Sequence, residues 1–140
     1  SYSEVCFAMA EANQRGWTSV GDTLTWLKLG IQASCERWGV PSASAASFAN
    51  AATLGSNPME TIAMAKWTDM FLQGYEAWTE WRRLDYPVLS PPAAAITGTG
   101  VPVRNGYGGL VPTQNKASYD AAVSAQGPDN QDTKLWWDTK

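Results

Sequence analysis

The sequence predicts a mainly α-helical protein with paired helices, one long central helix and an irregular C-terminal tail. Three observations lead to this fold class. Apolar residues recur every three or four positions through the first 83 residues, helix-capping residues precede these runs, and Pro and Gly become frequent after Pro87. We therefore expect a helical scaffold followed by a segment that either wraps over a scaffold or is itself functional.

The composition limits the possible functions. A chain of 140 residues is long enough for one domain with a sizeable core, and its net charge of −3 argues against nucleic acid as a partner. No stretch approaches the roughly 20 apolar residues of a membrane-spanning helix, and no signal-peptide pattern is present. Because there are eight Trp and no His, any catalysis would rest on carboxylates or Cys.

Residues 1–41 are predicted to form an antiparallel helical hairpin. Its first helix begins at Ser1, whose spacing to Glu4 is that of a capping box, and ends at Gly16. The apolar face of this helix is expected to consist of Tyr2, Val5, Cys6, Met9 and Ala12. Because the sequence opens abruptly on a helix and without Met, we expect it to be a piece of a larger chain.

The second helix of the hairpin is predicted to follow a short turn. Asp22 precedes it as a cap, and Gly39 and Pro41 end it. Apolar residues at helical spacing line its inner face: Leu24, Leu27, Ile31, Cys35 and Trp38. The short connection favours antiparallel packing of the two helices.

Residues 42–87 are predicted to contain a short helix and then one long helix. The segment from Ser42 to Leu54 is rich in Ala and Ser, which favours a short and weakly anchored helix. Asn57 as a cap and Pro58 at the first position predict the start of the long helix, which would continue to about Arg83.

The end of this long helix is the most distinctive stretch of the sequence. Five residues follow alternating spacings of four and three and are expected to share one buried face: Trp67, Phe71, Gly74, Trp78 and Trp81. Gly74 in the helix interior is expected to allow the close approach of a neighbouring helix.

Charged residues lie on another face of the same stretch. Glu76, Glu80 and Arg83 share this face, where Glu80 can pair with Arg83 three residues later. Arg82 follows Trp78 by four residues and can stack its guanidinium group on the indole. We therefore predict that residues 73–87 have a structural role, in which the Trp face packs and the Glu–Arg face fixes the helix end.

Residues 88–140 are predicted to form an irregular tail. Its first part contains frequent Pro and Gly, which interrupt regular structure, and one short helix is predicted from Asn115 to Ala125. The adjacent Trp136 and Trp137 are costly to expose to water. We therefore expect at least one of them to pack against the protein.

Cys6 and Cys35 both lie in predicted helices, on or beside apolar faces. Small buried side chains are the favoured interpretation, and a disulfide between the two helices is the alternative, so their redox state stays open. Two Cys residues do not form a metal site on their own, and we expect neither a metal nor a cofactor.

The pair Glu76 and Glu80 is a candidate for glycoside hydrolysis, because one helical turn approaches the carboxylate separation of about 5 Å in a retaining enzyme. Catalytic pairs, however, come from separate elements and need one carboxyl group in an apolar pocket. Arg82 and Arg83 lie close in the sequence, which favours ionised carboxylates with a structural role. We therefore predict no catalytic residue.

Sugar rings stack on indoles, so the Trp residues are candidates for ligand contact. The helical spacing of Trp67, Trp78 and Trp81 favours the core instead. Trp17 and the Trp136–Trp137 pair are the indoles whose context allows exposure, although packing is favoured for these as well.

Two short motifs in the tail are interpreted as turns. Residues 106–109, with the sequence Gly-Tyr-Gly-Gly, lack the Lys and the strand-to-helix context of a phosphate-binding loop. Asp129, Asn130 and Asp132 resemble part of a calcium loop, but the Gly and the distant Glu of an EF-hand are missing. A solvated turn is favoured there over a weak cation site.

Four segments in order carry a resemblance to a known family. The first three are residues 2–12 (Tyr-x-Glu-Val-x-Phe-x-x-Ala-Glu-Ala), 30–40 (beginning Gly-Ile-x-Ala-Ser) and 66–87. The fourth is residues 134–138 (Lys-Leu-Trp-Trp-Asp). Together they resemble the C-terminal part of the SusD-like (SusD/RagB) family. The structural signature comprises Trp67, Gly74, Glu76, Trp78, Glu80, Trp81, Arg82, Arg83, Trp136 and Trp137.

A further segment departs from the family pattern Ile-Pro-Arg-Arg-x-x-Tyr-Pro-x-x-Glu-x-x-x-Asn. Its spacing is kept from Val101 to Asn115, but Val103 replaces an Arg, Gly108 a Pro and Val111 a Glu. We expect the segment to keep its path while part of its polar contacts is lost.

The resemblance implies an α-helical protein whose tetratricopeptide-like helix pairs support a more irregular binding region. It also implies a non-catalytic lipoprotein on the extracellular face of the outer membrane. Such proteins capture oligosaccharides, or peptides in some branches, for import through a partner TonB-dependent (SusC-like) transporter. The lipid anchor and most ligand contacts of the family lie upstream of the matching part. No ligand-binding residue is therefore assigned.

A helical-repeat scaffold that only contacts other proteins is the alternative function. Retardation by a glycan in affinity electrophoresis distinguishes the two. An all-α hydrolase is disfavoured, since no His and no nucleophile–base spacing is present.

Overall fold

A computed structural model describes residues 1–95 and 100–138 of the chain. These residues form helices and irregular segments, with no β-strand among them, so the mainly α-helical fold class is confirmed. The chain divides into two compact units, residues 1–87 and residues 88–140, which we describe one at a time.

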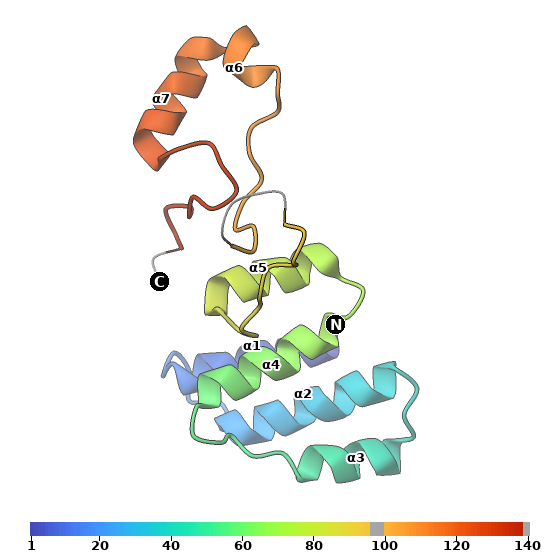
Figure 1. Ribbon diagram of the computed structural model, residues 1–140. Coiled ribbons are helices and arrows are strands. Elements are labelled where there is room, and N and C mark those ends of the chain that lie inside the picture. Colours follow the sequence, from blue (N-terminus) through green and yellow to red (C-terminus); the bar gives the residue numbers. More distant parts are fainter. Residues whose placement is uncertain (96–99, 139–140) are drawn as a thin grey trace. The chain divides into compact units, whose positions relative to one another are not determined.

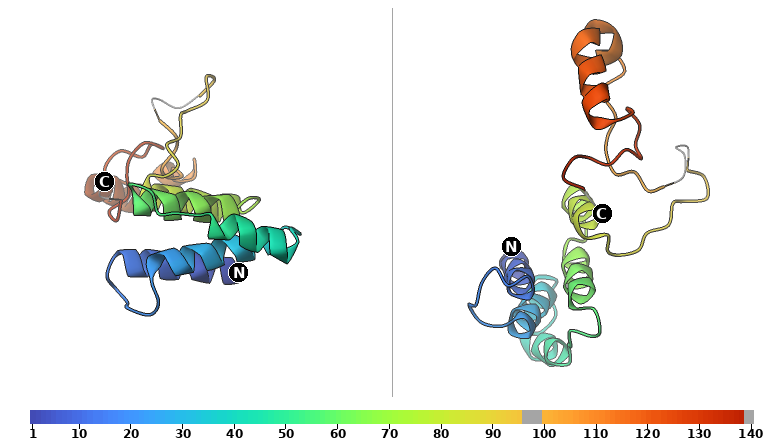
Figure 2. Two further views of the ribbon diagram at one scale, coloured as in Figure 1. Left: turned by 90° about the horizontal axis from the view of Figure 1, so that it is seen from below. Right: turned by 90° about the vertical axis from the view of Figure 1, so that its left-hand side faces the viewer.

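The first unit is a stack of helices. Its members are α1 (Tyr2–Gln14), α2 (Thr23–Arg37), α3 (Ser42–Asn50), α4 (Pro58–Asp69) and α5 (Gly74–Leu84). Helices α1 and α2 form an antiparallel hairpin, and α4 packs against both (Figures 1 and 2). Helix α3 lies on α2, and α5 lies on α4.

Local capping interactions set most helix ends in this unit. The side chains of Ser1, Asp22 and Asn57 accept hydrogen bonds from backbone N–H groups in the first turns of α1, α2 and α4. Gly16 and Gly39 follow α1 and α2 with φ of +71° and +86°. Because glycine adopts this left-handed conformation without steric cost, both helices end where the sequence predicts.

The core lies between α1, α2 and α4. Its fully buried cluster consists of Phe7, Ala10, Leu27 and Ile62. Gly30 of α2 faces the ring of Phe7, and a Cβ atom at Gly30 would lie only 2.6 Å from Phe7 Cε1. The absence of a side chain at this glycine therefore allows α1 and α2 to approach closely.

Gly30→Ala is expected to lower the free energy of unfolding by about 1–3 kcal/mol, since the buried Phe7 ring has to move. Gly74→Ala is the matched control, because nothing lies within 4 Å of a Cβ atom there. This second variant is expected to be neutral or to stabilise by about 0.4–1 kcal/mol. Urea unfolding of both variants measures the difference, and equal effects would contradict the close approach at Gly30.

The buried face of α1 differs from the predicted one. Tyr2 and Val5 are exposed, whereas Ser3 and Glu11 are buried beside Cys6, Phe7 and Ala10. The prediction counted apolar residues, but two polar residues on the inner face have hydrogen-bonding partners there. The buried face of α1 therefore lies around the helix from the face that the apolar residues predict.

The long helix predicted from residue 58 to 83 is wrong, because the structure has α4 and α5 in its place. The Arg37 Nη2 atom donates to the carbonyl oxygen of Asp69, which in a continuous helix would accept from Gln73. Gln73 donates instead to the Met70 carbonyl oxygen at 2.8 Å, and Leu72 adopts φ of +68°. The carbonyl oxygen at the end of α4 thus accepts a hydrogen bond from the Arg37 side chain of α2 instead of from the backbone.

The break changes the position of the signature residues. Gly74 is the first residue of α5 and has no close neighbour, so the predicted close helix approach at Gly74 is wrong. Trp67 belongs to α4, whereas Trp78 and Trp81 belong to α5. All three indoles are half-buried at the edge of the unit and lie outside its fully buried core cluster.

The second unit is largely irregular. It contains a single turn, α6 (Val111–Gln114), and α7 (Lys116–Gln126), which matches the helix predicted from 115 to 125. The Val103 N–H group donates to the Gln131 carbonyl oxygen at 2.9 Å and joins the two irregular segments. Near the end, Trp136 is exposed and Trp137 is half-buried.

Two expectations from the sequence concern membrane-spanning helices and the two cysteines. None of the described helices combines the length and the apolar character that crossing a bilayer requires. Cys6 and Cys35 are free thiols, the first fully buried in α1 and the second half-buried in α2. The favoured interpretation of the Cys residues as small core side chains agrees with the burial of Cys6.

Candidate functional site

A bidentate ion pair connects the charged face of α5 to α1. The Arg83 guanidinium group donates from Nη1 to Glu11 Oε1 and from Nη2 to Glu11 Oε2, the latter at 2.5 Å. Arg15 of α1 also donates to Glu11 Oε1, at 2.8 Å. The nearly buried carboxylate of Glu11 therefore lies between two cations.

Glu80 extends this arrangement to α4. Its Oε2 atom accepts from Arg83 Nη2 at 2.7 Å, which is the pair predicted from their spacing. Its Oε1 atom lies 2.8 Å from Lys66 Nζ on α4. We call this series of contacts the ion-pair chain, defined as Arg15, Glu11, Arg83, Glu80 and Lys66. It connects α1, α4 and α5.

The ion-pair chain is unsuitable for glycoside hydrolysis. Both carboxyl oxygens of Glu80 contact a cation, whereas a general acid needs a protonated carboxyl group in an apolar environment. Glu76 is exposed and does not belong to the ion-pair chain. Glu80 is therefore held by structural ion pairs. Glu76 lacks the apolar pocket that a catalytic acid needs.

The sequence predicts one pair of the ion-pair chain, Glu80 with Arg83, but not the contacts with Glu11 and Lys66. Glu80 and Arg83 were identifiable because they lie three residues apart on one helix. Glu11 and Lys66 come from separate helices, and no local spacing links them to Arg83 or Glu80. The only available signal was the resemblance of the Ala-Glu-Ala sequence around Glu11 to the family motif, because Glu11 lies outside the apolar face predicted for this helix.

Acidification is expected to remove the contribution of Glu11 to stability. Burial alone would raise the pKa of this carboxyl group, but Arg83 and Arg15 outweigh burial and lower the pKa below its ordinary value of 4.5. Because the folded protein then binds fewer protons, the contribution is complete above pH 4.5 and is lost as the pH falls through the lowered pKa.

Urea unfolding at pH 7 and pH 3 tests this pH dependence. The wild-type protein is expected to lose more stability between the two values than Glu11→Gln, which has no carboxylate to protonate at this position. Equal losses in the two proteins would show that the pKa of Glu11 is not lowered.

A second polar cluster centres on Asp69 at the end of α4. This carboxylate is fully buried, and its two oxygens lie 3.0 and 2.8 Å from Ser3 Oγ and share the single hydroxyl proton of that residue. Arg37 Nη2 lies 2.8 Å from Asp69 Oδ1 and also donates to the Asp69 carbonyl oxygen. The cluster therefore joins α1, α2 and the corner that follows α4.

Packing is predicted for Trp17 and for at least one of Trp136 and Trp137, and in the structure only Trp137 of these three indoles is half-buried. Trp17 projects into solvent, where the Arg15 guanidinium carbon lies 5.1 Å from its ring centre.

Trp26 is half-buried, and its Nε1 atom donates to the Val20 carbonyl oxygen at 2.7 Å. On α5, Arg82 stacks on Trp78 at 3.8 Å, as their spacing predicts. Trp17 and Trp136 thus remain exposed.

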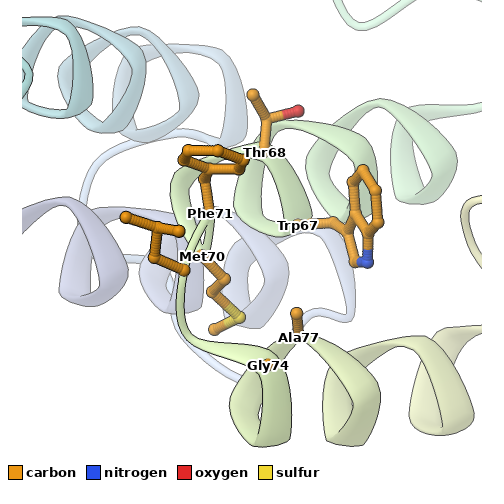
Figure 3. Close-up of a pocket in the computed structure, with 7 residues that line it drawn as sticks. Trp67, Thr68, Met70, Phe71, Gly74 and Ala77 are labelled. Atoms are coloured by element: carbon orange, nitrogen blue, oxygen red, sulfur yellow. The ribbon is translucent and has the colours of Figure 1, made fainter.

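An apolar hollow of about 520 Å³ lies at the corner between α4 and α5 (Figure 3). Its lining residues are Trp67, Thr68, Met70, Phe71, Leu72, Gly74 and Ala77. The side chain of Leu72 is 80% exposed, and the edge of Phe71 contacts Trp38 with ring centres 5.8 Å apart. Polar groups are scarce here, so the hollow suits an apolar surface better than the hydroxyl groups of a sugar.

In the second unit, the tail motifs form a connected loop pair. Asp129 accepts from Arg104 Nη2 at 3.3 Å and from the Tyr107 N–H group at 3.0 Å. The carboxylate is therefore already neutralised by a cation, which argues against a calcium loop. No group of His, Cys, Asp and Glu suited to a metal occurs in residues 1–95 and 100–138.

The Arg104–Asp129 pair anchors the segment from Val101 to Asn115, which departs from the family pattern. Arg104 is buried, and its Nε atom donates to the Asn105 carbonyl oxygen at 3.2 Å. The remaining Arg of that pattern thus still holds the segment in place, although the residue before it is Val103.

Comparison with known proteins gives a consistent family. The SusD-like family model, described as starch-binding and associating with the outer membrane, matches residues 1–108. No curated protein sequence matches the chain significantly.

Solved structures with the same fold include three close matches. A SusD-like protein from Bacteroidetes AC2a is 30% identical with a TM-score of 0.87, and a chitin-binding protein is 31% identical with a TM-score of 0.90. A chitin-binding SusD homologue from Flavobacterium johnsoniae is 26% identical with a TM-score of 0.80. The alignments cover 100, 100 and 99% of this chain but only 30, 33 and 36% of those proteins. The chain thus spans about a third of their length.

Proposed function

Because the chain belongs to the SusD-like family, we propose that this protein captures oligosaccharides at the outer membrane. The observation that carries the proposal is the family match over residues 1–108, since that family is described as starch-binding. Two similar structures with TM-scores of 0.90 and 0.80 are named as chitin-binding, which supports a glycan as the ligand. The proposed role includes delivery of the glycan to a TonB-dependent transporter and a lipid anchor on the extracellular face.

The proposed capture is non-catalytic. The paired carboxylates of Glu11 and Glu80 support this view, because each contacts two cations and connects helices. A glycosidase instead needs two carboxyl groups in different environments on either side of the scissile bond. The charged residues of the signature are therefore proposed to hold the fold rather than to act on a substrate.

Affinity electrophoresis of the intact protein tests the proposal. Gels that contain soluble starch, glycol chitin or other glycans are expected to retard the protein in at least one case. Incubation with the retarding glycan is expected to release no new reducing ends. If no glycan of a broad panel retards the protein, the proposed function is wrong, and release of reducing ends would overturn its non-catalytic character.

A second candidate function is contact with another protein, and the apolar hollow at the α4–α5 corner favours it. Leu72 is exposed there in a left-handed conformation that is unfavourable for a bulky residue. Co-purification with a TonB-dependent transporter that is lost in Leu72→Asp, while retardation by glycans is unchanged, would assign this surface to the transporter contact.

A further inference from the structure

The second unit contains a polar hollow of about 750 Å³. It lies where the segment after Arg104 runs beside the segment that follows α7, joined by the hydrogen bond from Val103 to Gln131. The lining differs from that of the apolar hollow, because it consists mainly of residues with amide or carboxylate side chains and includes a single aromatic residue, Tyr107. We infer that this hollow is a saccharide-contact site, with Tyr107 as the surface on which a sugar ring stacks.

The Tyr107 ring is held in one orientation from several sides. Its edge contact with Tyr119 has ring centres 5.6 Å apart and an interplanar angle of 76°. The Tyr107 hydroxyl oxygen accepts from Gln126 Nε2 at 2.8 Å, and its backbone N–H group donates to Asp129. The side chain is nevertheless 38% exposed. An ordered and accessible ring loses little entropy when a sugar face packs on it.

Asp129 holds the two walls of the hollow together. Its carboxylate accepts from Arg104, from the Tyr107 N–H group and from the Tyr119 hydroxyl group, the last at 3.3 Å. Burial and the carboxylate of Asp129 raise the pKa of Tyr119, whose hydroxyl group is protonated at neutral pH and donates to Asp129. Asp129 is therefore a positioning residue, and its oxygens are occupied before a ligand arrives.

Other polar side chains of the lining are available to a ligand. No hydrogen bond within the described residues engages the side chains of Asn105, Gln131 and Asp132. Asn130 Oδ1 accepts from the N–H groups of Asp132 and Thr133, at 3.0 and 2.8 Å, which fixes the plane of its amide. Amides both donate and accept, and a carboxylate accepts, which together match the hydroxyl groups of a sugar.

The charges and amides of the hollow disfavour other ligand classes. An anion would meet the carboxylates of Asp129 and Asp132, while the nearby cation, Arg104, is already paired. A metal ion would find Asp129 engaged by that same cation. An apolar ligand would leave the amides of the lining unpaired. A neutral ligand with many hydroxyl groups and one apolar C–H face satisfies both the amides and the Tyr107 ring.

The inference of this site rests on the proposed capture of oligosaccharides and adds a place on the protein where the oligosaccharide makes contact. Residues 129–132 of the lining follow residue 108, the last residue that the family model matches. The lining is therefore built largely from a part of the chain outside that match, and in this proposal its side chains set which glycan binds.

Isothermal titration of the intact protein with N-acetylchitohexaose and maltohexaose tests the site. Tyr107→Ala is expected to weaken binding of the preferred oligosaccharide about tenfold, which corresponds to loss of one stacking contact, and Tyr107→Phe to keep it within about twofold. Gln131→Ala combined with Asp132→Ala removes hydroxyl partners without removing a buried group and is also expected to weaken binding. Tyr75→Ala, which removes an 81% exposed ring from α5, is the control.

The outcomes separate this site from the proposed function. If the wild-type protein binds an oligosaccharide and both Tyr107→Ala and the Gln131–Asp132 double variant keep its affinity, the site is wrong and the capture function stands. If the wild-type protein binds no glycan of the panel, the capture function and the site are both overturned. Circular dichroism and thermal unfolding of each variant identify any loss of folded protein.

Discussion

Arg83→Met is expected to lower the free energy of unfolding by about 2–4 kcal/mol. The substitution keeps much of the apolar volume but removes both hydrogen bonds to Glu11 and the one to Glu80. The nearly buried Glu11 carboxylate would then be left with Arg15 alone. The lower end of the range reflects the exposure of Arg83 itself, which is only partly withdrawn from water.

An exposed ion pair provides the matched control for Arg83. Lys116 and Asp120 lie 2.8 Å apart on α7 with side chains that are 72% and 53% exposed. Lys116→Met is expected to change stability by less than about 0.5 kcal/mol. A double-mutant cycle with Glu11→Gln and Arg83→Gln then measures the coupling between the two residues. If Arg83→Met is as mild as the control, the ion-pair chain does not stabilise the fold.

The parts of the fold that the sequence predicted correctly depend on neighbouring residues. Asp22 caps a helix because its side chain reaches the N–H group of Thr25, three residues later. Gly39 ends α2 because it adopts a positive φ at low cost. Both interactions are complete within one helical turn, so the sequence pattern contains all the information needed to locate these ends.

The break between α4 and α5 could not be predicted in this way. Apolar spacing and propensity favour a continuous helix through residues 70–73, and the structure interrupts it through a contact with Arg37, more than 30 positions earlier in the sequence. The same reasoning applies to α1, where Ser3 and Glu11 are buried because of partners on α4 and α5. Polar residues on an inner face are predictable only when their partners are known.

The candidate site shows the same division. The stretch from 73 to 87 was identified as structural from spacing alone, and the pair of Glu80 with Arg83 is present. The polar hollow around Tyr107 was interpreted from the sequence as two separate turns. Its walls come from residues more than 20 positions apart, and Asp129 brings them together through hydrogen bonds that no short motif encodes.

Asp69→Ala is expected to have the largest effect of all, a loss of about 3–5 kcal/mol. The carboxylate is fully buried, and its removal leaves the Ser3 hydroxyl group without its acceptor and the Arg37 guanidinium group without its partner anion. Asp69→Asn keeps the volume and one acceptor oxygen. Its cost is therefore expected to be smaller than that of Asp69→Ala, as measured by urea unfolding at pH 7.

Arg37→Ala separates the two roles of the Asp69 cluster. It frees the carbonyl oxygen of Asp69 for a helical hydrogen bond but leaves the buried carboxylate with Ser3 alone. If Arg37 is what ends α4, this variant is expected to lose stability and yet gain helical signal in circular dichroism, because Gln73 then regains its acceptor. Lys116→Ala, which removes an exposed cation, is the control for charge alone. Loss of stability without a gain in helical signal would show that the corner after α4 forms independently of Arg37.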